Sequence, residues 1–149
     1  MLWLRGESFT SGVSDYYGDD PSRESELHLV HVNIVIEADI PISTTARLDT
    51  ATPWVILNAE INRRLGLRPS EPMVALNTAV GRMVGSLERF PITLPAEEGD
   101  SLEIDATLFV CEDWDRSNFL GYNGFLERIR FALDPRLAKF YFGPFSEGP

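Results

Sequence analysis

The sequence is poor in the residues from which many catalytic and metal sites are built. It has one cysteine, Cys111, and two histidines, His28 and His31. A single cysteine excludes a disulfide within the chain and a zinc site made of four thiolates from one chain. Cys111 ends an apolar run and is interpreted as a small buried apolar side chain. Positions three apart on a strand face opposite sides, so the two histidines are a poor metal clamp and are better interpreted as solvated or core-edge residues.

Several common motifs are also missing. No G-x-S-x-G, G-x-x-x-x-G-K-[ST] or G-x-G-x-x-G sequence occurs, which leaves serine hydrolases and both Gly-rich phosphate-binding loops without support. The acidic stretch "CEDWD" (residues 111–115) lacks the alternating ligands of an EF-hand loop, so a solvated turn is favoured over a calcium site. We expect neither a metal nor a cofactor.

Basic residues are outnumbered by acidic ones. The 149 residues include 13 Lys and Arg against 23 Asp and Glu, which gives a formal net charge of -10. An acidic surface repels phosphate groups, so neither nucleic acid nor an anionic membrane is an expected partner. No apolar run approaches the roughly 20 residues of a membrane span, and the N-terminal apolar run is too short for a signal peptide. The expected location is cytoplasmic.

The chain length fits one domain, preceded by a tail. Residues 1–26 are polar and acidic, with no usable hydrophobic period, and are predicted to form an N-terminal tail, disordered or packed through its aromatics. A pro-segment, an inhibitor that fills a groove and a disordered leader are all compatible with it. Residues 27–149 are predicted to form the domain.

Short punctuated strands dominate residues 27–149. Val and Ile alternate with polar residues over 31–36, and further strand-like runs cover 73–78, 82–94, 101–112, 130–135 and 139–143. Gly81 lies between two of these runs, as a hairpin requires. The strands are mostly not separated by helices, so we predict an all-β fold, a closed barrel or a sandwich, with one or two short helices.

The clearest helix signal is "NAEINRRLGL" (residues 58–67). Asn58 suits the N-cap, Glu60 the positive end of the helix dipole and Gly66 the exit. Ile61 and Leu65 are the expected buried edge. A second short helix is predicted in "NGFLERI" (residues 123–129).

Two separated segments carry the strongest functional signal. In "ARLDTATPWVIL" (residues 46–57), Asp49 lies between apolar runs and is followed by Thr50, Ala51 and Thr52; further on comes "NFLGYNGFLERI" (residues 118–129). Together these segments resemble the apolar-Asp-Thr-Gly-Ala and apolar-apolar-Gly halves of a retropepsin-like aspartic protease. The intervening "ALNTAVGRMVGSLERFPITL" resembles the flap hairpin of that family, and "NAEINRRLGL" matches the helix that bacterial and cellular relatives carry after the active-site loop. The resemblance covers roughly residues 29–142 in order.

The resemblance implies an acid-protease fold and an endopeptidase that takes extended peptide or protein segments as substrate. It implies catalytic roles for Asp49, Thr50 and Ala51, substrate binding by Thr78, Ala79, Val80 and Gly81, and a structural loop at Leu120 and Gly121. An aspartic protease needs two carboxylates that share a proton. Because the chain holds one copy of the motif, a homodimer is expected to supply the second carboxylate, with the Thr50 hydroxyls interlocking across the axis.

One departure from the family pattern leaves alternatives open. Ala51 stands where the family has glycine and Thr52 where it has alanine; a positive φ at residue 51 would strain the backbone. A catalytically impaired domain that binds peptides or mediates dimerisation is therefore the main alternative. Weaker ones are a barrel for a small ligand, or a non-catalytic loop in which Asp49 merely caps neighbouring amides. Arg47 is compatible with either a surface charge or a partner of the loop.

Overall fold

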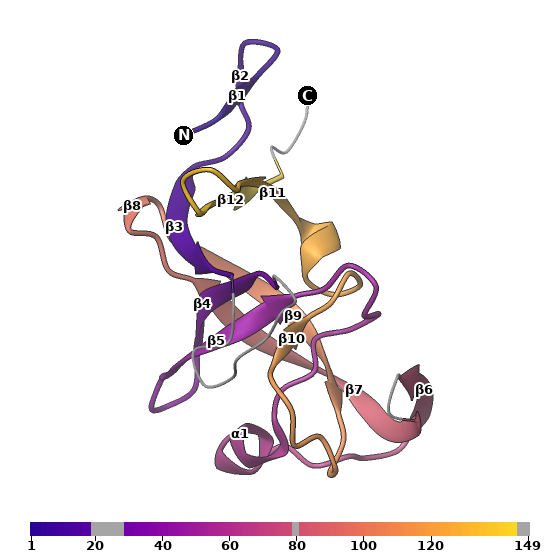
Figure 1. Cartoon of the computed structure of the whole chain (residues 1–149). Helices are drawn as coiled ribbons and strands as arrows, with labels where there is room; N and C mark the ends of the chain where they lie inside the picture. Colours follow the sequence, from indigo (N-terminus) through magenta and orange to yellow (C-terminus); the bar gives the residue numbers. More distant parts are fainter. Residues whose placement is uncertain (19–28, 79–80, 146–149) are drawn as a thin grey trace.

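The computed structural model describes residues 1–18, 29–78 and 81–145 (Figure 1). Its elements confirm the predicted all-β fold class with short helices. In chain order they are β1 (Trp3–Leu4), β2 (Glu7–Ser8), β3 (Gly12–Tyr17), β4 (His31–Ile36), β5 (Ile42–Leu48), α1 (Ala59–Arg64), β6 (Val74–Thr78), β7 (Gly81–Leu94), β8 (Glu98–Gly99), β9 (Leu102–Val110), β10 (Phe119–Leu120), the 3-10 helix η1 (Leu126–Arg128), β11 (Ile129–Asp134) and β12 (Lys139–Pro144).

The main sheet follows the order β10-β5-β4-β3-β12-β11. Its neighbours are antiparallel except β10 and β5, which run parallel. In the part of the chain that the structure describes, the end strands β10 and β11 do not pair with each other. The long strands β7 and β9 pair along nine residues each and cross behind β4 and β5 (Figure 1). The core lies between these crossing strands.

The alternation that predicts the first domain strand also explains its burial. Val32, Ile34 and Ile36 of β4 are fully buried, as are Ile92 of β7 and Leu108 of β9. Side chains two apart on a strand share a face, so this spacing places one face of β4 in the core. Each such side chain contributes roughly 1.5–3 kcal/mol when fully buried.

The N-terminal segment departs from the prediction of a tail over residues 1–26. Residues 12–17 form β3, which pairs with both β12 and β4 and therefore belongs to the sheet. Val13 and Ser14 are buried, and the Lys139 ammonium lies 2.5 Å from the Asp15 carboxylate. Ahead of β3, the β1–β2 hairpin projects from one end of the molecule (Figure 1). Residues 19–26 lie outside the described residues.

The predicted helix forms α1, and its sequence signals are used as expected. The Asn58 side chain accepts a hydrogen bond from the Glu60 amide at 2.9 Å, which makes it the N-cap. Gly66 has a φ of 72° just after the helix. Ile61 and Leu65 are partly buried against the core, while the buried helix residues are Ala59 and Asn62. The predicted second helix is shorter and forms the 3-10 turn η1.

The predicted hairpin around Gly81 is present between β6 and β7. Thr78 pairs with Gly81, and the two residues between them in the sequence, Ala79 and Val80, lie outside the described residues. The Thr78 hydroxyl donates to the Gly81 carbonyl at 2.8 Å. Gly81 has a φ of 119°, a conformation that other residues rarely adopt.

A small apolar cluster lies beneath this hairpin, and we call it the hairpin cluster. Its buried members are Ile56, Leu76, Phe109, Cys111 and Trp114. It joins the hairpin to the rest of the domain through Leu76. Over the described residues, no helix is long and apolar enough to cross a membrane.

Candidate active site

The loop that carries Asp49 begins where β5 ends. The last residues of β5, Arg47 and Leu48, pair in parallel with Phe119 and Leu120 of β10. The Asp49 amide then donates to the Leu120 carbonyl at 3.1 Å, and the Asp49 carbonyl accepts from the Thr52 amide at 3.1 Å. Backbone hydrogen bonds therefore fix the loop on both sides of the aspartate. The two segments that the sequence singles out, 46–57 and 118–129, are brought together.

Gly121 explains why the second segment requires glycine. A Cβ at this position would lie 2.1 Å from the Trp54 carbonyl oxygen and 2.6 Å from that of Thr52. The following amides continue the contact: Tyr122 donates to Thr52 and Asn123 to Pro53, both at 2.8 Å. The Gly121 backbone thus packs directly against the Asp49 loop. The fully buried Leu120 anchors the second segment in the core.

The Asp49 carboxylate is held by two local contacts. Its Oδ1 accepts from the Ala51 amide at 3.0 Å, and its Oδ2 lies 4.0 Å from Nη2 of Arg47. The side chain retains 22% exposure. The amide contact is the one expected of a capping aspartate, and it also sets the orientation of the carboxylate. Arg47 is therefore a partner of the loop, the second of the two interpretations left open by the sequence.

Ala51 carries no left-handed backbone strain. Among the described non-glycine residues, positive φ values occur at Arg5 and Ala138 only. The concern that alanine would strain this position therefore does not apply to residue 51. Thr50 and Ala51 are both exposed.

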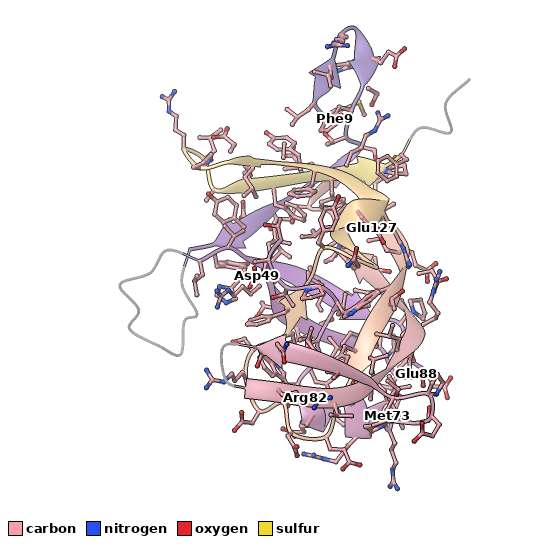
Figure 2. The ribbon with its side chains drawn as sticks, turned by 90° about the vertical axis from the view of Figure 1, so that its right-hand side faces the viewer. Phe9, Asp49, Met73, Arg82, Glu88 and Glu127 are labelled. Atoms are coloured by element: carbon pink, nitrogen blue, oxygen red, sulfur yellow. The ribbon has the colours of Figure 1, made fainter. Side chains whose placement is uncertain are left out.

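One cavity of about 340 Å³ joins the Asp49 loop to the β6–β7 hairpin. Asp49, Ala51 and Thr52 line it from the loop, and Asn77 and Thr78 line it from β6. In Figure 2, Asp49 lies above this hairpin, with Arg82 near its turn and Met73 at the other end. Gly81 is exposed and is not among the described lining residues.

No protein-family model matches the sequence, and no curated protein matches it. Among solved structures, the chain is similar to the crystal structure of a retropepsin-like aspartic protease from Rickettsia conorii, at 15% sequence identity and a TM-score of 0.58. The match covers 87% of this chain and 98% of that chain. The chain has the retropepsin-like fold. At this identity the similarity concerns the path of the backbone.

Within this retropepsin-like fold, the cavity also contains residues to which the sequence assigned no role. Trp114, Arg116 and Phe119 line it, together with Arg47. The Arg47 guanidinium carbon lies 5.0 Å from the centre of the Phe119 ring, and the Trp114 and Phe119 rings meet edge to face with centres 5.3 Å apart. The sequence does hold one signal for these residues. Trp114 is an aromatic residue inside the acidic stretch "CEDWD", shortly before the F-L-G element.

Two asparagines fix the loop that carries these residues. The Asn58 nitrogens bond to this loop at two points: the backbone N–H donates to Oδ1 of Asn118 at 2.7 Å, and Nδ2 donates to the Arg116 carbonyl at 3.1 Å. Asn118 in turn donates to the Thr45 carbonyl at 3.0 Å. The indole of Trp114 donates to the Ser117 carbonyl at 2.8 Å. The helix N-cap and the cavity wall are therefore one hydrogen-bonded unit.

The remaining candidate residues lie away from the cavity or are buried. His31 is 5% exposed, while His28 lies outside the described residues. Cys111 is 3% exposed, and burial raises the pKa of its thiol because the thiolate would be poorly solvated. Across residues 1–18, 29–78 and 81–145, no three His, Cys, Asp or Glu side chains cluster in a way that could hold a metal ion.

Proposed function

We propose that the chain is an aspartic endopeptidase that acts as a homodimer and hydrolyses extended peptide segments. The observation that carries the proposal is the shared cavity: Asp49 lines one wall and the hairpin strand β6 the other. A carboxylate opposite a hairpin suits peptide hydrolysis, because an extended peptide can lie between them and bond to the strand backbone. The retropepsin-like fold adds to this support.

The proposed reaction uses two Asp49 residues, one from each copy of the chain. Two carboxylates in contact cannot both ionise cheaply, so the pair shares one proton. The ionised member takes a proton from a water molecule as the water oxygen attacks the scissile carbonyl carbon. The protonated member gives its proton to the carbonyl oxygen, which forms a tetrahedral diol. The diol returns a proton through the pair to the amide nitrogen, the C–N bond breaks, and an acid and an amine leave.

Thr50 and the hairpin have supporting roles in this proposal. Thr50 is exposed beside Asp49, where its hydroxyl is available to the equivalent loop of a second copy. Interlocked hydroxyls would fix the distance between the two carboxylates, and a twofold axis makes the contact symmetric. The hairpin, with Thr78 to Gly81 at its turn, would act as the flap that covers the peptide and excludes water.

A second candidate function is a non-catalytic domain that binds an extended peptide in the same cavity. Two features favour it: Ala51 and Thr52 in place of glycine and alanine, and the engagement of Asp49 Oδ1 by the Ala51 amide. In this case the carboxylate is a loop-stabilising group. Peptide binding would then survive its replacement by asparagine.

The deciding experiment compares wild-type protein with Asp49→Asn on an unfolded substrate, denatured casein, over about pH 3–7, a window set by ordinary and raised carboxylate pKa values. Wild type should cleave, and Asp49→Asn should lower the rate at least about 100-fold, the lower range of general acid–base contributions. Asp100→Asn, an exposed aspartate near β8, is the matched control and should cleave normally. A wild-type protein that cuts nothing in this window would contradict the protease proposal.

A further inference from the structure

The charge of the Asp49 cavity is opposite to that of the chain as a whole. The chain has a formal net charge of -10, but two arginines, Arg47 and Arg116, line the cavity beside Asp49. Asp49 is the one acidic residue among the described residues that line it. The acidic neighbours of Arg116, such as Asp115, are exposed and do not line the cavity over this part of the chain. This contrast points to an anionic ligand group.

Arg47 is positioned to present its N–H groups to a ligand. Its guanidinium lies over the Phe119 ring at 5.0 Å, and its side chain is 32% exposed. Stacking on a ring occupies the flat face of the guanidinium and leaves its N–H edge free to donate. The Asp49 contact, at 4.0 Å, is longer than a hydrogen bond. A guanidinium has five N–H donors, which match the two oxygens of a carboxylate.

Arg116 approaches the same cavity from a loop that is held in place. Its carbonyl accepts from Asn58 Nδ2 at 3.1 Å, and the next side chain but one, Asn118, bonds to both Asn58 and Thr45. The exposed Arg116 side chain therefore extends from a fixed backbone. Two arginines from different segments therefore line one cavity.

The cavity is small, and part of its lining is apolar. Ile56, Leu76, Trp114 and Phe119 line it, and all four belong to the hairpin cluster or pack against it. Its volume of about 340 Å³ is near the lower end of the range of roughly 300–1,000 Å³ that ligand pockets occupy. An apolar wall with an arginine edge suits a short aliphatic stem that ends in a carboxylate. Glutamate and aspartate side chains have this form.

In the proposed dimer, the positive charge of the cavity arginines exceeds the negative charge of the Asp49 pair. In the proposed dimer, two Asp49 carboxylates sharing one proton carry a single negative charge. Four arginine side chains, Arg47 and Arg116 from each copy, would face that single charge. A substrate carboxylate would offset part of the remaining positive charge next to the reacting bond.

We infer that this cavity binds an acidic side chain of the substrate, so that the enzyme selects extended peptides with Glu or Asp beside the scissile bond. The inference rests on the proposed function and names its substrate class. Arg47 and Arg116 are the specificity-determining residues. A hydrogen-bonded carboxylate that is replaced by an amide should lose about tenfold or more in kcat/KM, the range expected for bonds to charged groups.

The first test maps the bonds that wild-type protein cuts in denatured casein, by mass spectrometry of the products. Glu and Asp should be enriched next to the cut bonds. Two peptides that differ only by Glu or Gln at the enriched position are then compared, and the Glu peptide should be the better substrate by about tenfold or more. Arg47→Met and Arg116→Met should each reduce this ratio, because methionine keeps an apolar stem without the charge. Arg63→Met, an exposed arginine of α1 outside the cavity, should leave it unchanged.

The Glu-to-Gln ratio is measured within each variant, so a general loss of activity cancels. Arg47→Lys sharpens the result: it keeps the charge but lacks the planar fork, and should restore part of the ratio. Cleavage without preference for acidic residues, or a preference that survives both methionine variants, would overturn the inference and leave the protease proposal standing.

Absence of cleavage would instead count against the protease proposal, and the inference would then be decided by binding. Fluorescence anisotropy of the labelled Glu and Gln peptides with wild-type protein gives the two affinities. Tighter binding of the Glu peptide that is lost in Arg47→Met would support the acidic cavity. Equal binding of the two peptides would overturn it.

Discussion

The two walls of the Asp49 cavity are built differently. On the Asp49 side, β5 pairs with both β4 and β10, and the loop beyond it is bonded to the Leu120–Asn123 backbone. On the hairpin side, β6 pairs with β7 alone among the described strands, and Leu76 connects it to the hairpin cluster. One wall holds a reactive group against several backbone contacts, and the other presents a strand. Substitutions should therefore cost most in the loop and least in the hairpin.

The largest effect on stability is expected at Gly121. Gly121→Ala would place a methyl group 2.1 Å from the Trp54 carbonyl oxygen, so the Asp49 loop would have to shift. The free energy of unfolding should fall by about 1–3 kcal/mol, the usual effect of overpacking, and cleavage should fall with it. Urea unfolding at fixed protein concentration measures this. Gly18→Ala, whose Cβ would meet no atom within 4 Å, is the control. Equal stability of the two variants would show that the loop is not held as described.

A smaller effect is expected from the hairpin. Thr78→Val removes the hydroxyl that donates to the Gly81 carbonyl at 2.8 Å. The free energy of unfolding should fall by about 0.5–1.5 kcal/mol, and KM should rise more than kcat falls. Thr78→Ser keeps the hydroxyl and should behave like wild type. If Thr78→Val destabilised as strongly as Gly121→Ala, the contrast between the walls would be lost.

A substitution at Ala51 tests the Asp49 wall by removing a methyl group instead of adding one. Because its φ is not positive, glycine relieves no strain there, and Ala51→Gly should lower the free energy of unfolding by about 0.4–1 kcal/mol through the more flexible unfolded chain. The cleavage rate should stay close to that of wild type. A large gain in rate would favour the impaired, peptide-binding alternative. Casein cleavage and urea unfolding on the same preparation separate the two effects.

The smallest expected effect concerns the reactivity of Cys111, which reports on the packing of the hairpin cluster. Its thiol is buried with Leu76 and Trp114, and its pKa is raised because burial disfavours the thiolate. Since the thiolate is the reactive form, native protein at pH near 8 should react with iodoacetamide far more slowly than urea-unfolded protein. Cys111→Ala should remove the signal. Equally fast reaction in both states would mean that the hairpin cluster opens freely.

Local signals in the sequence predicted local structure well. The alternation over residues 31–36 gave β4, and Asn58, Glu60 and Gly66 gave α1. The close approach of residues 46–57 and 118–129 was expected from a family resemblance, and the fold agrees with it. The catalytic roles of Asp49, Thr50 and Ala51, and the substrate-binding role of Thr78 to Gly81, stay predictions.

What the sequence did not predict depends on contacts between distant segments. The polar run "SGVSDYY" has no hydrophobic period, so β3 is recognisable only once β12 and β4 pair with it. Arg116 and Trp114 enter the cavity because Asn58 and Asn118, 60 positions apart, bond to each other. The φ of Ala51 depends on the same three-dimensional setting. None of these features produces a recognisable pattern in the sequence around the residues concerned.

The most direct test of the account mixes wild-type chains with Asp49→Asn chains in equal amounts and measures casein cleavage after exchange of subunits. If each active site needs one Asp49 from each of two chains, random pairing leaves about a quarter of the activity of the same total amount of wild-type protein. If each chain worked alone, about half would remain, and that result, with exchange verified by native mass spectrometry, would contradict a site shared between two copies.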